Sequence, residues 1–226
     1  MKIFKHKPIA VVLLSGGLDS ATTLYYARSK GLCTFCIIFD YGQRHRREIR
    51  QAVRLAKVSG SDYTVCRIRL PWKGSALLDK TIALPKNRQH IPREIPATYV
   101  PARNIIFLSF AASYAEAIGA GTVFIGANAI DYSGYPDCRP EFYQAYQLAL
   151  RRGLKAGVEG RGVRIETPLI RKTKAQIIRM GMKLKVPYAL TWSCYCGGKR
   201  PCGTCDSCIL RAKGFVQAGE KDPGAR

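Results

Sequence analysis

A run of six aliphatic residues leads directly into a glycine-rich segment near the start of the chain. Residues 9–14 predict a buried strand, and residues 20–30 predict a helix that ends at Gly31. Between them stands Ser15-Gly16-Gly17-Leu18-Asp19-Ser20. Glycines let backbone N–H groups approach an anion closely, and the following helix adds its positive amino end. The segment therefore predicts a cradle for phosphate groups.

This loop differs from the two common nucleotide-binding fingerprints. It lacks the Gly-Lys-Ser/Thr ending of a Walker A loop and the G-x-G-x-x-G of dinucleotide-binding proteins. The alternative is a plain strand-to-helix turn in which Asp19 caps the helix. Six residues of this type between a strand and a helix favour the phosphate-binding interpretation.

Strand and helix patterns alternate along most of the chain. This order predicts parallel βαβ units and an α/β fold, with a doubly wound, mostly parallel sheet flanked by helices. We expect strands at residues 9–14, 33–39, 65–70, 122–127 and 164–167, and helices at residues 20–30, 46–59, 105–119, 140–152 and 173–184.

Two segments depart from the alternation and set the expected domain organisation. Residues 71–101 contain five prolines and predict an irregular excursion within an α/β domain of residues 1–190. Residues 191–226 are rich in cysteine and glycine until Cys208, which we expect to open a short last helix. This part predicts a small C-terminal zinc-binding subdomain.

Four cysteines near the C-terminus have the spacing C-x7-C-x2-C-x2-C: Cys194, Cys202, Cys205 and Cys208. The x2 spacings let thiolates converge on one ion, and a four-thiolate site favours structural zinc. An iron–sulfur centre is the alternative, and Cys196 is a spare thiol that leaves the ligand set ambiguous. The neighbouring glycines and cations cannot build an apolar core, so a metal must replace the missing contacts.

Composition limits the remaining possibilities. The 226 residues suit one domain or one domain with a small appendage, and 47% hydrophobic residues suit a globular chain. No apolar run is long enough to span a bilayer, and no leader is evident, so we expect a cytoplasmic protein. The net charge of +22 would attract polyanions, including nucleic acid, but the basic residues are scattered. The arginines of residues 44–54 repeat at helical spacing, as on a solvated face.

The glycine-rich segment resembles the pyrophosphatase loop of enzymes that split ATP into AMP and pyrophosphate. The resemblance implies an adenine nucleotide alpha hydrolase-like fold, in which Asp19 helps to hold Mg²⁺ against the phosphates. It assigns ATP binding to residues 14–24, which are Leu14, Ser15, Gly16, Gly17, Leu18, Asp19, Ser20, Ala21, Thr22, Thr23 and Leu24.

Further segments resemble one family of these enzymes, the 7-cyano-7-deazaguanine synthases of the queuosine pathway. They lie at residues 40–45, 100–104, 126–128, 131–142, 167–169, 173–175 and 191–195, and the block at residues 131–142 is the most specific. The similarity runs over residues 9–215. Two features depart from the family pattern: Cys196 stands where Asn is more usual, and the chain is unusually basic.

The resemblance implies that 7-carboxy-7-deazaguanine and ammonia are converted, with two ATP, into the 7-cyano compound. Adenylation of the acid makes an electrophile that ammonia attacks, and adenylation of the amide then leads to the nitrile. In that reaction Asp19, Lys174 and Arg139 are the candidate catalytic residues, while Asp131, Asp137 and Glu141 are the candidate substrate-binding residues.

Chemistry suggests how these residues act, with an alternative for each. Lys174 suits a phosphate contact or is an exposed helix lysine, and Arg139 suits the substrate carboxylate. Asp137 or Glu141 can accept hydrogen bonds from a guanine-like edge, unless Asp137 and Arg139 simply form a local ion pair. Arg103 and Asn104 serve ATP or cap a helix.

Two rival functions share the same signals. One is an ATP-dependent tRNA-modifying enzyme, a thiolase or lysidine-type ligase, whose basic surface would bind tRNA. The other is a tRNA-binding protein of the same fold without turnover. No part of the chain is long enough for a glutamine amidotransferase domain, so ammonia comes free or from a partner. The apolar helix expected at residues 105–117 is compatible with a homodimer.

Overall fold

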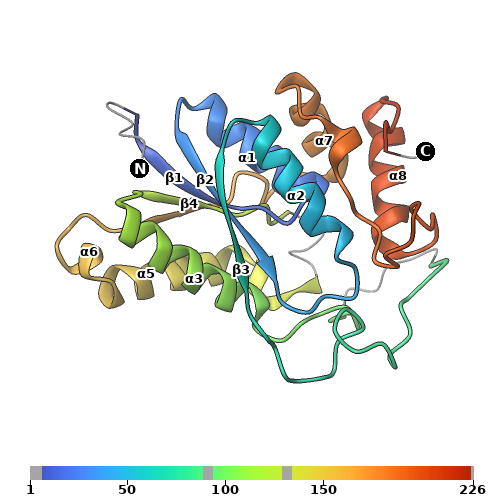
Figure 1. The fold of residues 1–226 in the computed structure, drawn as a ribbon, viewed down its shortest axis with the longest axis horizontal. Helices are drawn as coiled ribbons and strands as arrows, with labels where there is room; N and C mark the ends of the chain where they lie inside the picture. Colours follow the sequence, from blue (N-terminus) through green and yellow to red (C-terminus); the bar gives the residue numbers. More distant parts are fainter. Residues whose placement is uncertain (1–6, 89–93, 129–133, 225–226) are drawn as a thin grey trace.

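A five-stranded parallel sheet forms the centre of the molecule in the computed structural model, which describes residues 7–88, 94–128 and 134–224 (Figure 1). The strand order is β3-β2-β1-β4-β5, and every neighbouring pair is parallel. The strands are β1 (Ile9–Leu13), β2 (Cys33–Asp40), β3 (Asp62–Arg67), β4 (Thr122–Phe124) and β5 (Arg164–Glu166). The predicted α/β fold with a parallel sheet is confirmed.

Helices cover both faces of this sheet (Figure 1). Alternate residues of β1 point to opposite faces: Ala10 and Val12 join one hydrophobic core, and Val11 and Leu13 join the other. The first core is completed by α1 (Leu18–Ser29), α2 (Arg47–Val58), α7 (Lys174–Lys183) and α8 (Asp206–Ala218). The second is completed by α3 (Arg103–Ile118) and α5 (Pro140–Gly153), which is followed by the short helix α6 (Lys155–Val158).

Helix α2 shows how the basic residues are arranged. Ala52, Leu55 and Ala56 are fully buried against the sheet, whereas Arg50 and Arg54 lie on the exposed face of the helix. This is the amphipathic pattern of a surface helix. The interpretation of the arginine run as a solvated helix face holds for Arg50 and Arg54. Arg44 instead lies before α2 and donates to backbone carbonyls of residues 76–82, and His45 is buried.

The structure differs from the prediction at several element boundaries, among them the starts of β3 and α8, and at one helix that was not predicted. Strand β3 begins at Asp62 because it pairs along β2 as an edge strand, where its polar first residues need no burial. Helix α8 begins at Asp206 and has 13 residues, since Cys205 already stands at its amino end. Helix α6 was missed because four residues carry no detectable period.

The predicted excursion contains no helix or strand in its described parts, residues 71–88 and 94–101. Its residue Lys86 instead forms an isolated antiparallel bridge to Cys205, and the Asn87 N–H donates to the Thr204 carbonyl at 2.8 Å. The excursion therefore lies against the cysteine-rich segment. Helices of the described part of the chain are all too short or too polar to cross a membrane.

Candidate functional site

The glycine-rich loop connects β1 to α1 through a conformation that only glycine tolerates well. Gly16 has φ of +88°, and a Cβ added there would lie 2.3 Å from the backbone oxygen of Glu48 in α2. The Ser20 hydroxyl donates to the Gly17 carbonyl at 3.1 Å and accepts from the Ser15 N–H at 3.2 Å. The loop is therefore fixed from both sides, by its own serines and by α2.

Helix α1 has Gly17 at its N-cap position, and no side chain caps it. Asp19 lies in the first turn, where a negative charge suits the helix dipole. The alternative in which Asp19 serves as the N-cap is therefore wrong. Its carboxylate is free to face other elements.

Asp19 forms an ion pair with Lys174 across 155 positions of sequence. The Lys174 ammonium lies 2.8 and 2.6 Å from the two carboxylate oxygens, and the Asn128 side-chain amide donates to the same carboxylate at 2.7 Å. The Lys174 side chain is 13% exposed, so the alternative of an exposed helix lysine is wrong. A lysine and a carboxylate thus face each other beside the loop.

Local sequence explains why Lys174 lies there. Thr173 and Gln176 form a reciprocal capping box that starts α7, so Lys174 is its first helical residue. Gly214 of α8 leaves room for the lysine stem, since a Cβ there would lie 2.4 Å from the Lys174 Cγ. The cysteine-rich C-terminal part therefore helps to shape the phosphate-loop region.

A cavity of about 260 Å³ opens at the carboxyl ends of the strands, the usual place for a ligand in an open α/β sheet. The phosphate loop, Asp19 and Lys174 line it. The other polar or aromatic lining residues include Tyr41, His45, Glu48, Arg103, Tyr135, Trp192, Tyr195 and Arg211.

Arg103 supplies positive charge to this cavity from the first turn of α3. Burial would lower its pKa, but the tyrosines Tyr41 and Tyr135, together with Cys138 and Asp137, raise the pKa overall, so the guanidinium stays charged. Burial in turn raises the pKa of Tyr41 to about 12, so Tyr41 stays a neutral phenol. Among the described residues, no carboxylate forms a salt bridge with Arg103, whose side chain forms a hydrogen bond with Tyr41.

A partly exposed carboxylate and a buried imidazole pair at the cavity, and neither was predicted from the sequence as a site residue. His45 Nε2 lies 3.0 Å from Glu48 Oε2, and Gln43 Nε2 donates to Glu48 Oε1 at 3.2 Å. Gln43 and His45 belong to residues 40–45, a segment that resembles the family. That resemblance was the sequence feature that could have identified them as site residues. Glu48 lies beyond that segment, and only the contact of α2 with the loop brings it to the cavity.

The predicted substrate residues fall in several places. Asp137 is buried and accepts a hydrogen bond from the Asn104 backbone N–H at 3.0 Å, so it caps the start of α3. Arg139 and Glu141 are exposed and do not line the cavity. No ion pair joins Asp137 to Arg139 within the described residues, so that alternative is wrong. Asp131 lies outside the described residues.

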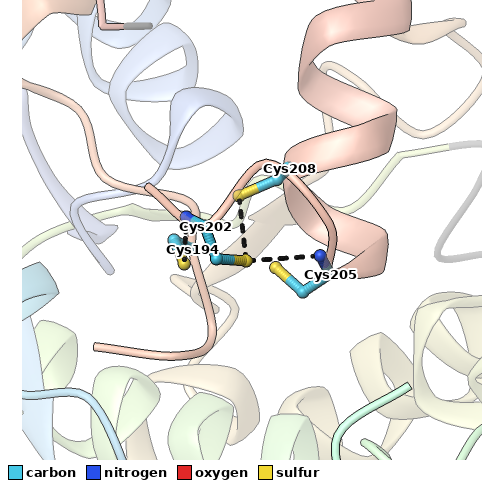
Figure 2. Close-up of side chains that lie close together, drawn as sticks. All are labelled: Cys194, Cys202, Cys205 and Cys208. Atoms are coloured by element: carbon cyan, nitrogen blue, oxygen red, sulfur yellow. Dashed lines mark hydrogen bonds between the residues drawn. The ribbon is translucent and has the colours of Figure 1, made fainter. Parts of the chain in front are cut away.

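The four predicted cysteines come together at the start of α8 (Figure 2). Their sulfur atoms all lie within 4.8 Å of one another, and Cys194, Cys205 and Cys208 are buried. Four sulfurs bound to one zinc ion at about 2.3 Å lie about 3.8 Å apart, so this cluster fits a tetrahedral metal ion with little movement. Hydrogen bonds from the Cys205 and Cys208 thiols lower the pKa of Cys194, which favours a thiolate there.

Cys196 lies beside the cluster but outside it. Its thiol donates to the Cys202 sulfur at 3.6 Å. Burial, the bond to Cys202 and the nearby thiolates raise the pKa of Cys196 to about 12, so it stays protonated. The four sulfur atoms that could hold one metal ion are those of Cys194, Cys202, Cys205 and Cys208, without Cys196.

Fold and site together define an α/β protein of the adenine nucleotide alpha hydrolase-like class. NMN synthetase from Francisella tularensis has this fold: the likeness covers 96% of this chain and 79% of that chain, with a TM-score of 0.52 at 17% identity. The family model described as queuosine biosynthesis protein QueC matches residues 9–219, and the chain belongs to that family.

Two relatives described as 7-cyano-7-deazaguanine synthase cover nearly the whole chain. The protein from Thermoplasma acidophilum is 57% identical over 215 residues, which are 95% of this chain and 90% of the relative. The protein from Nostoc sp. is 53% identical over 218 residues, which are 95% of each chain. The resemblance inferred from the sequence segments is confirmed.

Proposed function

We propose that this chain is an ATP-dependent ligase that converts 7-carboxy-7-deazaguanine and ammonia into 7-cyano-7-deazaguanine. The observation that carries the proposal is the phosphate loop, which opens onto a cavity lined by Asp19 and Lys174. The chain is also 57% identical to a relative described as 7-cyano-7-deazaguanine synthase. This site provides what the reaction needs: a place for ATP phosphates beside a pocket for a small acid.

The chemistry requires two activations. A carboxylate is a poor electrophile, so its oxygen attacks the α-phosphorus of ATP and displaces pyrophosphate. Ammonia then displaces AMP from the acyl adenylate and leaves the amide. A second ATP adenylates the amide oxygen, and loss of AMP gives the nitrile. The protein contributes mainly positioning and charge neutralisation.

Residues 14–24 would hold the ATP phosphates through loop N–H groups and the amino end of α1. The Asp19 carboxylate would bind Mg²⁺, which neutralises charge on the pyrophosphate. We assign Lys174 to the phosphates because its ammonium lies beside Asp19 at the loop. Arg103 joins these cations as a candidate for the substrate carboxylate or the α-phosphate, since it lines the cavity while Arg139 does not.

The C-terminal cysteines have a structural part in this proposal. We assign zinc to the four-sulfur cluster, because a closed set of thiolates has no open position for chemistry. The ion would fix residues 191–226 against the α/β domain of residues 1–190. The homodimer, the cytoplasmic location and the substrate roles of Asp131, Asp137 and Glu141 stay predictions.

The experiment is a measurement of AMP and pyrophosphate release from ATP with Mg²⁺ and ammonium, with and without 7-carboxy-7-deazaguanine. Mass spectrometry follows the nitrile. Acid-dependent AMP release with a nitrile product is the expected result. AMP release that requires tRNA and ignores the acid would overturn the proposal in favour of a tRNA-modifying enzyme.

A further inference from the structure

Glu48 has a charge environment unlike that of the other carboxylate in the cavity lining. Within the described residues, two acidic residues line the cavity, Asp19 and Glu48. Asp19 already has a cation, since the Lys174 ammonium lies 2.6 Å away. Glu48 is held by the neutral Gln43 amide and by His45, and within the described residues no lysine or arginine forms a salt bridge with it. A cavity-facing carboxylate without a cation can accept one from solution.

His45 holds the Glu48 carboxylate through a side-chain hydrogen bond. The histidine side chain is only 2% exposed, while that of Glu48 is 17% exposed. The His45 Nδ1 atom is buried and has no hydrogen-bond partner, so the tautomer with its proton on Nε2 leaves no buried donor unpaired. That tautomer donates to Glu48 Oε2 and leaves the carboxylate facing the cavity.

Glu48 also lies close to the phosphate loop, beside which the C–N bond of the amide would form. Its backbone oxygen would lie 2.3 Å from a Cβ at Gly16, so this turn of α2 packs directly on the phosphate loop. The reacting carbonyl carbon is bonded through oxygen to the α-phosphorus, next to the phosphates that the loop would hold. A cation bound by Glu48 would therefore lie near the acyl adenylate.

We propose that Glu48 binds the ammonium ion and accepts a proton from it, which frees the nitrogen lone pair for attack. This inference rests on the proposed function. The nitrogen forms the C–N bond, and the C–O bond to AMP breaks with its electrons on the phosphate oxygen. Of the four ammonium protons, two stay in the amide, one goes to Glu48, and one leaves with AMP. The negative charge of Glu48 therefore acts on the nitrogen substrate. Adenylation of the acid does not require this charge.

The test separates adenylation from attack by ammonia. Glu48→Gln keeps the side-chain size and removes the charge, and Glu159→Gln makes the same change at an exposed residue of the surface. Exchange of pyrophosphate into ATP, driven by 7-carboxy-7-deazaguanine without ammonium, reports adenylation. Amide formation with ammonium reports attack. Both rates are measured for the unmodified chain and the two variants.

We expect Glu48→Gln to keep acid-dependent exchange within about threefold of Glu159→Gln, and to lose amide formation by about 10²-fold or more, the scale of general-base catalysis. Intact exchange also shows that the variant is folded. Hydroxylamine, a nucleophile that is mostly unprotonated at neutral pH, should form hydroxamate equally well with the variant and the unmodified chain.

Three results would overturn the inference. Exchange that falls as far as amide formation would place Glu48 in ATP or acid binding. Amide formation at the level of Glu159→Gln would remove Glu48 from the reaction, and an equal loss with hydroxylamine would exclude proton acceptance. Absence of acid-dependent exchange in the unmodified chain would instead overturn the proposed function, and this inference with it.

Discussion

The phosphate loop lines the cavity and the cysteine cluster lies next to lining residues such as Ser193 and Ser207, but different forces hold the two regions. The loop continues from β1, where Val11 and Val12 are fully buried between two layers of helices. The cluster's own buried set is small, with one tryptophan and three cysteines. Burial of apolar surface can hold the loop without any ligand, whereas the cluster lacks enough apolar surface to do so.

The two regions are nevertheless connected through α8. Phe215 of α8 belongs to the same core as α1, and Gly214 lies against the stem of Lys174. A change in the cluster can therefore reach the phosphate loop through α8 and α7. We therefore expect a substitution in the cluster to lower stability, metal content and adenylation together. A substitution in the loop should leave the metal content unchanged.

The largest effect should follow from removing the metal, by chelation or by Cys205→Ser. Structural zinc contributes an apparent 10 to 16 kcal/mol in finger peptides, so we expect a loss on the order of 5 kcal/mol or more in unfolding free energy. Metal content, thermal unfolding and proteolysis within residues 191–226 measure it. Adenylation should fall too, because α8 positions Lys174.

Two cysteines outside the four serve as controls for this prediction. Cys196→Ser should keep one metal ion per chain, since Cys196 is outside the tetrahedral set. Cys33 lies in β2, so Cys33→Ser should leave the metal content unchanged. Metal lost from Cys196→Ser, or a Cys205→Ser variant as stable as Cys33→Ser, would contradict the comparison.

Gly16→Ala should give the next largest effect. The alanine would need φ near +88° and would meet the Glu48 backbone oxygen at 2.3 Å, so α2 or the loop must move. We expect about 3 kcal/mol of destabilisation, from backbone strain and overpacking together. Chemical denaturation measures the stability, and pyrophosphate exchange should be nearly abolished with metal content unchanged.

Gly121→Ala is the matched control, because a Cβ there meets nothing within 4 Å and the φ of Gly121 is not positive. Its unfolding free energy should stay within about 0.5 kcal/mol of the unmodified chain. If Gly16→Ala behaves in the same way, the tight fit of the loop against α2 is not required.

These two regions also show what sequence can predict. The hexapeptide and the cysteine spacing are local patterns, and both the loop and the four-sulfur cluster were found from them. The Glu48 contact with Gly16 and the pairing of Asp19 with Lys174 depend on how distant elements pack, so spacing alone could not supply them. The hydrogen bond of Asp137 could not be predicted for the same reason, since its partner Asn104 lies 33 positions away.

A smaller effect on stability, but a large one on activity, is expected from Lys174→Gln. The ion pair with Asp19 is partly exposed, so its loss should cost about 1 kcal/mol. Adenylation should fall by about 10²-fold to 10³-fold, because a cation at the phosphates is lost. Pyrophosphate exchange measures it, with the exposed Lys183→Gln at the other end of α7 as the control. Equal rates in the two variants would remove Lys174 from catalysis.

The smallest effect should come from the link between the excursion and the cluster. Arg88 pairs with Asp206 in the first turn of α8, with nitrogen to oxygen distances of 3.2 and 2.5 Å. Arg88→Ala should lower stability by about 1 kcal/mol, and Arg161→Ala, which breaks an exposed pair with Glu159, by about half as much or less.

This last prediction decides whether contacts with protein or coordination to metal hold the cluster. Asp206 keeps a favourable place at the amino end of α8 even without Arg88, so the sulfurs should stay together and metal content should not change. Denaturation in low and high salt measures the pair, because screening should shrink the difference between Arg88→Ala and the unmodified chain. If Arg88→Ala instead loses its metal, or several kcal/mol of unfolding free energy, the excursion helps to hold the cluster together. Metal coordination alone would then not explain the stability of the cluster.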